Sequence, residues 1–173
     1  QRINRPSDDP TGIVNTLRYK STINESETYL DNISEARNFL NTTDSALGNV
    51  TDILHRASEL TVEGINGTNS EEARNTIAVE IRQLQEQIGI IANTTFGSKY
   101  IFGGTNVTQA PLQEGLWVGN DLEMNLEIGA GTTVPINSSM RETIYSEDSA
   151  NPGIYQLLNK LATDLETGDT TGM

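Results

Sequence analysis

The sequence predicts a mainly α-helical, elongated protein: a hairpin of long helices that forms a rod, with a small β-rich insert after it. Three observations support this fold class. Five prolines occur in the 173 residues, but none lies between residues 11 and 110. Apolar residues recur at alternating spacings of three and four, the period of a helix that buries one side. Only 35% of the residues are hydrophobic and 5% aromatic, which favours exposed helices over a compact globule.

The first helix is expected to run from about Ser7 to Ile65, a length of roughly 85 to 90 Å at 1.5 Å per residue. Ser7 can cap its first turn, and Asp8 and Asp9 lie next to the positive end of the helix dipole. The turn sequence Asn-Gly-Thr-Asn of residues 66–69 follows it. Such a helix is far longer than the average helix of a globular protein.

One face of this helix carries residues at alternating three- and four-residue spacings, with several polar positions among them. We call this face the predicted seam and expect it to pack against other helices, with Val50, Ala57 and Leu60 widening it. The predicted seam consists of Leu30, Ile33, Arg37, Leu40, Asp44, Leu47, Thr51, Leu54 and Thr61.

A second helix is expected after Ser70, which can act as its cap, with Glu71 and Glu72 in the first turn. Because the break between the helices is short, they should lie antiparallel as a hairpin. We interpret the apolar residues of the second helix as a packing surface and not as a ligand site. These residues are Ile77, Ile81, Leu84, Ile88 and Ile91.

The N-terminal part of the first helix is expected to lack a partner within the hairpin. The second helix is the shorter one, so it can cover only the part from Phe39 to Ile65. The uncovered apolar residues are expected to form an assembly interface, filled by a helix from a missing part of the chain or by a neighbouring subunit. These residues are Ile13, Leu17, Ile23 and Leu30.

Glycines become frequent after Phe96 and separate short apolar runs. Residues 121–128 alternate apolar side chains with acidic or amide ones, which is typical of a half-buried strand. Residues 132–136 can pair with this strand across the Gly129-Ala130-Gly131 turn. The segment therefore predicts a β-hairpin.

A short amphipathic helix is expected from Ile154 to Leu165. The chain is therefore divided into a helical rod domain at residues 1–98 and a β-rich inserted segment at residues 99–150. Residues 151–173 form a short helix and tail in this division.

Composition argues against several classes of function. The chain has 11 Lys and Arg against 24 Asp and Glu, a net charge of -13. It has no basic patch that could neutralise nucleic-acid phosphates or an anionic membrane surface, so neither is expected as a partner. No apolar run has the length needed to cross a bilayer.

Catalytic chemistry is equally sparse. Cysteine is absent, and His55 is the single histidine, in the middle of the first helix. A zinc site usually needs several His or Cys ligands, and a Ser-His-Asp triad needs a pocket around its histidine. We therefore predict no enzymatic activity, no metal and no cofactor.

Four motifs, in this order, resemble those of a known protein family. Residues 2–12 read Arg-Ile-Asn-Arg-Pro-Ser-Asp-Asp-Pro-Thr-Gly, and residues 56–62 with the turn 66–69 form the second motif. The second helix carries the third. Residues 100–105 read Tyr-Ile-Phe-Gly-Gly-Thr and precede Ala-Pro-Leu at 110–112. Together they resemble flagellin-like axial proteins of bacteria, and the prolines of the first motif and the last motif resemble the hook-filament junction branch. Leucine replaces the usual phenylalanine at the final position.

The resemblance implies a fold and a function. The fold is a rod domain of N-terminal and C-terminal helices with a β-rich domain inserted between them, of which this chain is expected to be a fragment lacking the terminal segments. The implied function is a structural subunit of the bacterial flagellum, an adaptor at the hook-filament junction that supports torque transmission and motility. A flagellin-type filament subunit is the alternative within the family. An extracellular helical adhesin is the alternative from another class.

The resemblance also implies partners. They are further copies of the chain in a ring or helical assembly, a neighbouring hook-associated protein, flagellin and an export chaperone. The expected location is the extracellular flagellum, reached through the flagellar export system without a cleaved signal peptide. Asp8 and Asp9 are expected mainly to stabilise the helix N-terminus. A second hypothesis is that they fix the joint to the missing terminal segment together with Arg2 and Arg5.

Overall fold

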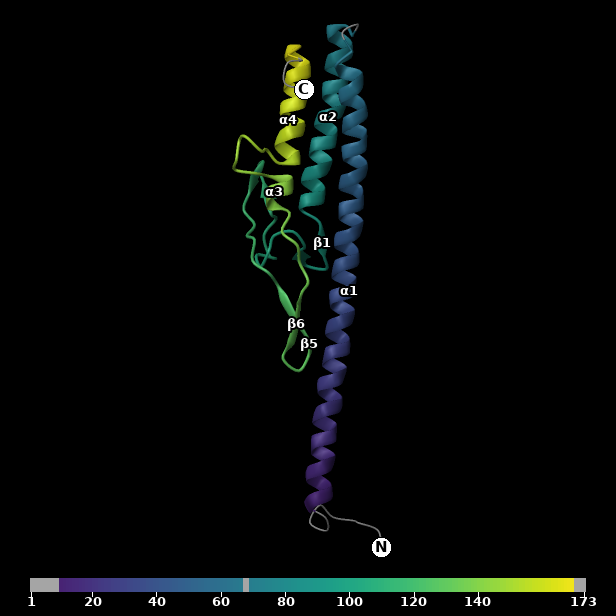
Figure 1. The fold of residues 1–173 in the computed structure, drawn as a ribbon, viewed down its shortest axis with the longest axis vertical. Helices are drawn as coiled ribbons and strands as arrows, with labels where there is room; N and C mark the ends of the chain where they lie inside the picture. The colour runs from purple at the N-terminus through teal and green to yellow at the C-terminus, as the bar shows by residue number, and fades with distance from the viewer. Residues whose placement is uncertain (1–9, 67–68, 170–173) are drawn as a thin grey trace.

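The structure, a computed structural model, describes residues 10–66 and 69–169. It is a long rod of helices with a side arm of loops and small hairpins beside its middle (Figure 1). Helix α1 spans Pro10–Gly64, α2 spans Glu71–Ala92 and α4 spans Ile154–Thr167. The predicted fold class, mainly α with a small β-rich insert in an elongated rod, is confirmed.

The side arm contains one short helix and three separate two-stranded antiparallel hairpins among the described residues. Its elements are β1 (Thr95–Phe96), β2 (Lys99–Tyr100), β3 (Leu112–Gln113), β4 (Leu116–Trp117), β5 (Asn125–Gly129), β6 (Thr132–Pro135) and α3 (Arg141–Ile144).

Helix α1 is unbroken over 55 residues, about 82 Å at 1.5 Å per residue. Many of its serine and threonine hydroxyls donate to the carbonyl oxygen four residues earlier, as Thr43 does to Phe39 at 3.0 Å. These bonds satisfy the hydroxyl groups without interrupting the helix. The predicted end lies within one residue of the observed end, whereas the predicted start at Ser7 lies outside the described residues.

Helix α1 packs only in part with the face that was predicted. Val50, Ala57 and Leu60, which were expected to widen the predicted seam, are buried, whereas most of the seam itself is exposed. On the predicted seam, Leu40 and Leu54 have exposed fractions of 45% and 38%. The buried side chains, with the exception of Ala57, each precede a position of the predicted seam by one. They are Ala36, Phe39, Thr43, Ala46, Val50, Ile53, Ala57 and Leu60. Residues 36–64 are called the packed half of α1 below.

The two faces differ in side-chain size and charge. A shift of one residue turns the helix by about 100°, and both faces repeat with the same period, so periodicity does not distinguish them. The predicted seam includes Arg37 and Asp44, which would have to leave water unpaired. The buried face has no charged residue, and its alanines let a neighbouring helix approach closely. The helix therefore packs with the uncharged, alanine-containing face, and the face that carries the leucines of the predicted seam stays largely exposed.

Helix α2 returns antiparallel along the packed half, and the predicted hairpin is confirmed (Figure 1). Its N-terminus is capped as predicted, because the Ser70 hydroxyl accepts a hydrogen bond from the Ala73 N–H at 3.2 Å. Of the five predicted apolar residues, four are buried and Ile91 is partly buried.

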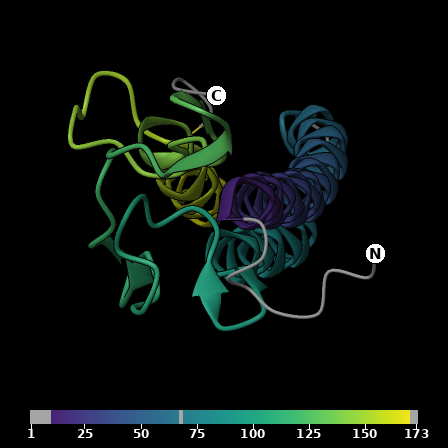
Figure 2. The same ribbon diagram turned by 90° about the horizontal axis from the view of Figure 1, so that it is seen from below.

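Helix α4 packs mainly on α2 and completes a three-helix layer around the packed half, seen along the rod in Figure 2. Leu158, Ala162 and Leu165 are buried in this contact. The Arg82 guanidinium donates to both carboxylate oxygens of Glu166 at 2.9 and 2.8 Å. Because Glu166 accepts these bonds, its pKa lies below its ordinary value, while that of Arg82 is raised.

Strands β5 and β6 form the predicted hairpin, although β5 begins at Asn125 and not at residue 121. Before β5, the Asn137 side chain takes the place of the backbone hydrogen bonds that would extend the pairing of the two strands. Its carbonyl accepts from the Met124 N–H at 2.7 Å, and its amide donates to the Leu122 carbonyl at 3.0 Å. The alternation of apolar and polar residues in the sequence does not show that a side chain, and not the backbone, makes these hydrogen bonds.

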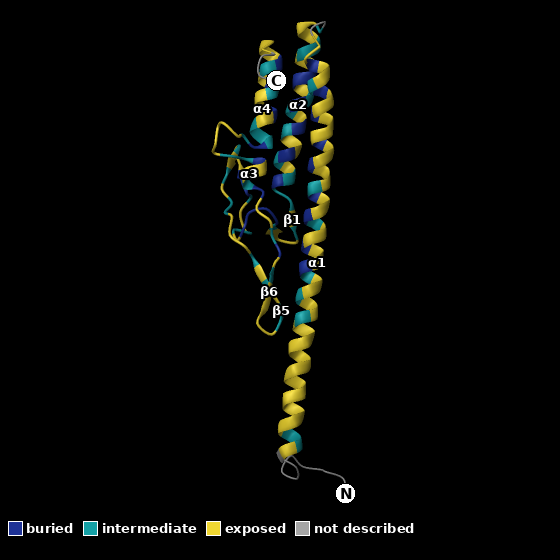
Figure 3. Ribbon diagram, in the orientation of Figure 1, coloured by how far each residue is buried: buried dark blue, intermediate teal, exposed yellow. Residues whose placement is uncertain are grey.

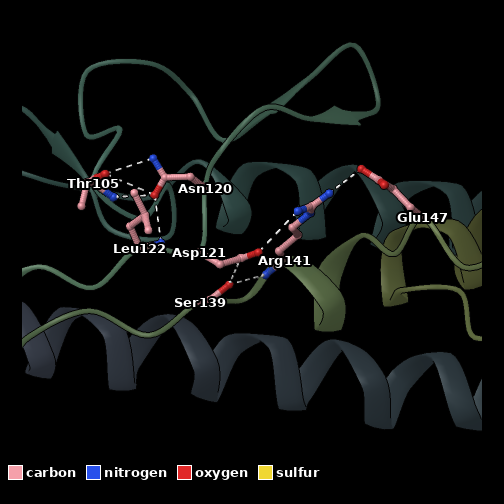
Figure 4. Close-up of polar contacts among 7 residues, drawn as sticks. All are labelled: Thr105, Asn120, Asp121, Leu122, Ser139, Arg141 and Glu147. Carbon is pink, nitrogen blue, oxygen red and sulfur yellow. Dashed lines mark hydrogen bonds and ion pairs between the residues drawn. The ribbon is translucent and has the colours of Figure 1, made fainter.

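The loops of the side arm are joined by Asn120 (Figure 4). Its side-chain oxygen accepts from the N–H groups of Thr105 and Leu122, both at 3.0 Å. Its amide donates to the Thr105 hydroxyl at 3.0 Å. One side chain therefore holds two loops that are fifteen positions apart in sequence.

Arg141, at the start of α3, forms a second joint (Figure 4). It forms ion pairs with Asp121 at 3.4 Å and with Glu147. The charge of Glu147, followed by the hydrogen bond to Asp121, raises the pKa of Arg141. Ser139 also donates to Asp121. These contacts join separate segments of the side arm to one another.

Candidate assembly interface

Residues 10–35 of α1, called the bare half, contain no buried residue among the side chains that the structure describes. Figure 3 shows this half almost wholly in the colour of exposed residues, whereas dark blue marks the packed half. The exposed fractions of Leu17, Ile23 and Leu30 are 62%, 55% and 63%. Large apolar side chains in such a position are typical of a surface that another chain covers.

The side arm contacts only the end of the bare half that adjoins the packed half, through β5 and β2. Asn32 donates to the Glu127 carbonyl at 2.7 Å, and Lys99 pairs with Glu35 at 3.0 Å. Partial burial, and next the charge of Glu127, raise the pKa of Tyr29. No hydrogen bond or ion pair joins residues 13–28 to another described element.

An exposed stripe continues from the bare half onto the packed half. Its members are separated by multiples of the three-four spacing and coincide from Leu30 onward with the predicted seam. A repeat of 3.5 residues drifts by about 20° per heptad on a straight helix, so a partner helix would have to coil around α1 with a left-handed twist. The exposed stripe consists of Tyr19, Ile23, Leu30, Ile33, Leu40 and Leu54.

The other predicted site residues fall in two places. Ile13 is partly buried. Arg2, Arg5, Asp8 and Asp9 lie outside the described residues. The role of all eight residues in assembly stays a prediction.

Sequence reasoning missed a second exposed apolar surface, on α2. Val79 and Ile90 are exposed there, on the side of the helix opposite to its buried residues. The signal was present, because Val79, Gln83, Glu86 and Ile90 repeat at spacings of four, three and four. Only two of these four residues are apolar, so their pattern is weaker than that of the buried residues on the opposite side of α2.

The described part of the chain shows no arrangement of side chains that resembles a catalytic or metal site. His55 is exposed on α1. Residues 10–66 and 69–169 contain no group of three or more His, Asp or Glu side chains that could hold a metal ion. Within the same residues, every helix is too short or too polar to cross a bilayer. What the site offers is contact surface.

A family model of the bacterial flagellin N-terminal helical region matches residues 1–107. The chain belongs to the bacterial flagellin family. The predicted resemblance is therefore confirmed.

Curated flagellar proteins are similar to this flagellin-family chain. It is 31% identical to flagellin FlaB1 of Treponema pallidum over 183 aligned residues, which cover 95% of this chain and 64% of that protein. It is 30% identical to flagellar hook-associated protein 3 of Escherichia coli over 139 residues, 79% of this chain and 44% of that protein. The chain thus spans less than two thirds of the length of these relatives.

Solved structures share the fold. Xanthomonas campestris FlgL superposes with a TM-score of 0.67 at 26% identity, over 72% of this chain and 42% of that one. A putative flagellar hook-associated protein from Vibrio parahaemolyticus has a TM-score of 0.82 at 19% identity, over 96% of this chain and 75% of that one. The second likeness supports the fold alone.

Proposed function

We propose that this flagellin-family chain is part of a structural subunit of the bacterial flagellum, an adaptor at the hook-filament junction that transmits torque. The observation that carries the proposal is the division of α1 into a packed and a bare half. A continuous helix of this length crosses from a stable three-helix layer into a surface built for partners. The likeness to hook-associated protein 3 and to FlgL supports the junction as its place.

In this proposal the bare half becomes buried on assembly. Leu17, Ile23 and Leu30 then pack against a returning C-terminal helix of the same protein, with neighbouring subunits outside it. Full burial of an apolar side chain of this size contributes about 1.5–3 kcal/mol. Asp8 and Asp9 would stabilise the helix start, or fix the joint to a terminal segment with Arg2 and Arg5.

The partners we propose are further copies in a ring or helical assembly, a neighbouring hook-associated protein, flagellin and an export chaperone. The location we propose is the extracellular flagellum, reached by the flagellar export system without a cleaved signal peptide. The role is mechanical and not enzymatic. The division into residues 1–98, 99–150 and 151–173 belongs to the same proposal, with the middle segment as the insert.

A filament subunit is the second candidate. The identity to flagellin FlaB1, which extends over 95% of this chain, favours it. Both candidates use the rod in the same way and differ in copy number along the flagellum. No comparison favours the helical adhesin.

Immunogold electron microscopy of purified flagella tests the proposal. A tag is inserted at the exposed β5–β6 turn, next to Ala130 and Gly131, in the protein of the source cell. Gold confined to the junction of hook and filament is the expected result. Gold along the filament would support the filament subunit instead, and gold absent from flagella that are otherwise complete would overturn both.

A further inference from the structure

Where the bare half meets the packed half, the predicted seam of α1 stays open along six positions. They follow one another at spacings of four, three, four, three and four, so they lie on one side of the helix. Five of them are exposed, and Leu47 is partly buried. We call this set the open seam. It consists of Ile33, Arg37, Leu40, Asp44, Leu47 and Thr51.

The open seam carries one charge of each sign. Arg37 and Asp44 are both exposed, and neither forms an ion pair with another residue that the structure describes. They lie one heptad apart on the same side of α1. Charges at a helix surface that have no partner within the chain can select the alignment of a second chain.

A second surface with the same spacing lies on α2. Its members are all exposed and lie on the side of the helix opposite to its buried residues, such as Ile81 and Leu84. We call it the outer face of α2. It consists of Glu72, Thr76, Val79, Gln83, Glu86 and Ile90.

Glu86 and Ile90 also adjoin a hollow of about 540 Å³, where α2 meets the β3–β4 hairpin. Glu114 and Tyr155 line the same hollow. Neither glutamate forms an ion pair within the described residues. The hollow therefore offers room and two carboxylates to the end of a long cationic side chain from another molecule.

The open seam and the outer face fit each other as two antiparallel helices. Read in opposite directions, both have spacings of four, three, four, three and four, so every position of one meets a position of the other. The layers, in order along α1, are Ile33 with Ile90, Arg37 with Glu86, Leu40 with Gln83, Asp44 with Val79, Leu47 with Thr76 and Thr51 with Glu72.

Charge disfavours the two neighbouring alignments. A shift by one heptad keeps the spacing but places Asp44 opposite Glu86 in one direction and opposite Glu72 in the other. Like charges that face each other are unfavourable. Neither shift brings Arg37 opposite a carboxylate, because it then faces Asn93 or Val79. The pairing of Arg37 with Glu86 therefore selects one register of the three.

The two surfaces cannot meet within one chain. Glu80 of α2 pairs with Arg56 of α1 at 2.6 Å. Glu86 lies six residues further along the antiparallel α2, level with α1 residues near 50 and about 20 Å from Arg37 along the rod.

The two surfaces also point to opposite sides of the rod. Ile90 and Asn49 line a common hollow between α2 and α1. Asn49 lies nine residues after Leu40, about 2.5 turns, and so on the opposite side of α1. Any contact between the open seam and the outer face must therefore join different molecules.

We propose that the open seam of one copy docks antiparallel on the outer face of α2 of a second copy, with Arg37 between Glu86 and Glu114. The inference rests on the proposed function, in which copies of the chain assemble, and names the surfaces that meet. Because α2 is antiparallel to α1 within each copy, the docked copies point in the same direction, offset by about 20 Å. The contact is heterologous, so it can continue from copy to copy as a ring or a helix.

This contact leaves the rest of the bare half to the partner already proposed for it. Helix α2 ends at Ala92, two residues after Ile90, and Ile90 lies opposite Ile33 in the docked pair. The second copy therefore stops short of Leu30. A returning C-terminal helix can still pack there and towards the N-terminus of α1.

One such contact is weak and selective. Exposed ion pairs contribute little affinity by themselves, but they steer association and penalise wrong alignments. Ile33 against Ile90, and Leu40 next to Val79, exclude water from part of the contact. Repetition of the contact from copy to copy adds to the stability of an assembly.

Disulfide cross-linking between copies is the direct test, because the chain contains no cysteine of its own. One batch of the full chain carries Leu40→Cys and a second carries Gln83→Cys, and the two are mixed and mildly oxidised at increasing concentration. A mixed dimer is expected. The matched controls replace the second batch with Thr76→Cys or Ile90→Cys, which are exposed on the same face one heptad away, and should give several-fold less mixed dimer.

Three results overturn the proposal. The first is a yield with Gln83→Cys that is no higher than with Thr76→Cys or Ile90→Cys, because the register is then wrong. The second is the absence of any mixed dimer. The third is dominance of Leu40→Cys homodimers, because the contact would then be symmetric. All four positions are exposed, so the substitutions leave the hydrophobic core intact.

Charge exchange gives a second readout, measured by sedimentation. Arg37→Glu and Glu86→Lys are each expected to weaken association about tenfold, and the chain with both substitutions should recover most of the loss. Arg18→Glu is the matched control, because it changes the net charge equally at an exposed position outside the open seam. Glu86→Lys makes the chain less negative, so general repulsion between copies does not explain a loss. An equal loss with Arg18→Glu, or no recovery in the double variant, contradicts the contact.

The gold-labelling experiment separates the two proposals. If the protein is found in the flagellum but Leu40→Cys and Gln83→Cys do not cross-link, the contact is wrong and the flagellar role stands. If the cross-link forms but the protein is absent from flagella, the contact stands and the role is wrong.

Discussion

The packed and bare halves of α1 form one helix with one repeating pattern, yet only the packed half has a hydrophobic core. In the packed half, α2 and parts of the side arm cover a face of alanines and larger apolar residues such as Phe39 and Leu60. In the bare half, side chains as large as leucine, isoleucine and tyrosine remain in water. The comparison teaches that a heptad-like period specifies that a helix will pack, and does not specify when or with which partner.

The two halves should therefore differ most in local stability. Isolated helices are marginal in water, and tertiary packing supplies most of the stability of helices in proteins.

Hydrogen exchange should give the largest contrast. Amides of residues 47–60 are expected to exchange only through opening of the three-helix layer, and those of residues 13–30 through fraying that costs little. The free energies of opening should differ by several kcal/mol, up to the whole stability of about 5–15 kcal/mol. Mass spectrometry of the full chain measures this. Equal protection of the two stretches would show that the bare half is already supported.

The next largest effect is expected from truncating a single core side chain. Phe39 is 1% exposed and meets Phe96 edge to face, with ring centroids 5.9 Å apart. Phe39→Ala should lower the free energy of unfolding by about 3–5 kcal/mol because it leaves a cavity. Leu40→Ala, the neighbouring position on the predicted seam, is the control and should cost less than about 1 kcal/mol. Urea denaturation that ranks them in reverse would mean that the packed face is wrongly assigned.

A smaller effect is expected from the ion pair that joins α2 to α4. Because both Arg82 and Glu166 are more than one third exposed, solvent screens the pair and Arg82→Gln should cost less than about 1 kcal/mol. The pKa of Glu166 is lowered in the folded state, so this stability is present above the ordinary pKa of a glutamate. It is lost as the pH falls through the lowered value.

Thermal melts of the unchanged chain and of Arg82→Gln at neutral and acidic pH measure the difference in stability between them. This difference should shrink in acid. Arg18→Gln in the bare half is the matched control and should leave the melting temperature unchanged at either pH. A difference that grows in acid would exclude Glu166 as the partner that matters.

The smallest effect on the chain itself is expected in the bare half. Leu17→Gln, Ile23→Gln and Leu30→Gln should each change the free energy of unfolding by no more than about 0.5 kcal/mol, since these side chains already face water. The same substitutions should weaken assembly of the intact protein, measured by sedimentation. Leu84→Gln, at a buried position of α2, is the contrasting variant and should destabilise the chain strongly. A large loss of stability from Leu17→Gln would show a partner within the chain.

Local signals were sufficient for much of this molecule. The run without proline, the Ser70 cap and the glycine turn between β5 and β6 act within a few residues, so the sequence alone determined α1, α2, the hairpin and the short last helix. The family motifs are local as well. The composition predicts no nucleic-acid partner and no catalysis, a prediction that rests on charge and residue type and not on the fold.

Only the tertiary structure decided which face of α1 is covered. The predicted seam and the buried face have the same period one residue apart, and the choice between them depends on the alanines that let α2 approach and on the charges at Arg37 and Asp44. The packing of α4 on α2, and the pair between Arg82 and Glu166, join positions 84 residues apart. Contacts between residues so far apart in sequence depend on the shapes and charges of whole surfaces that meet in space. The residue pattern of one helix does not identify the element that packs against it.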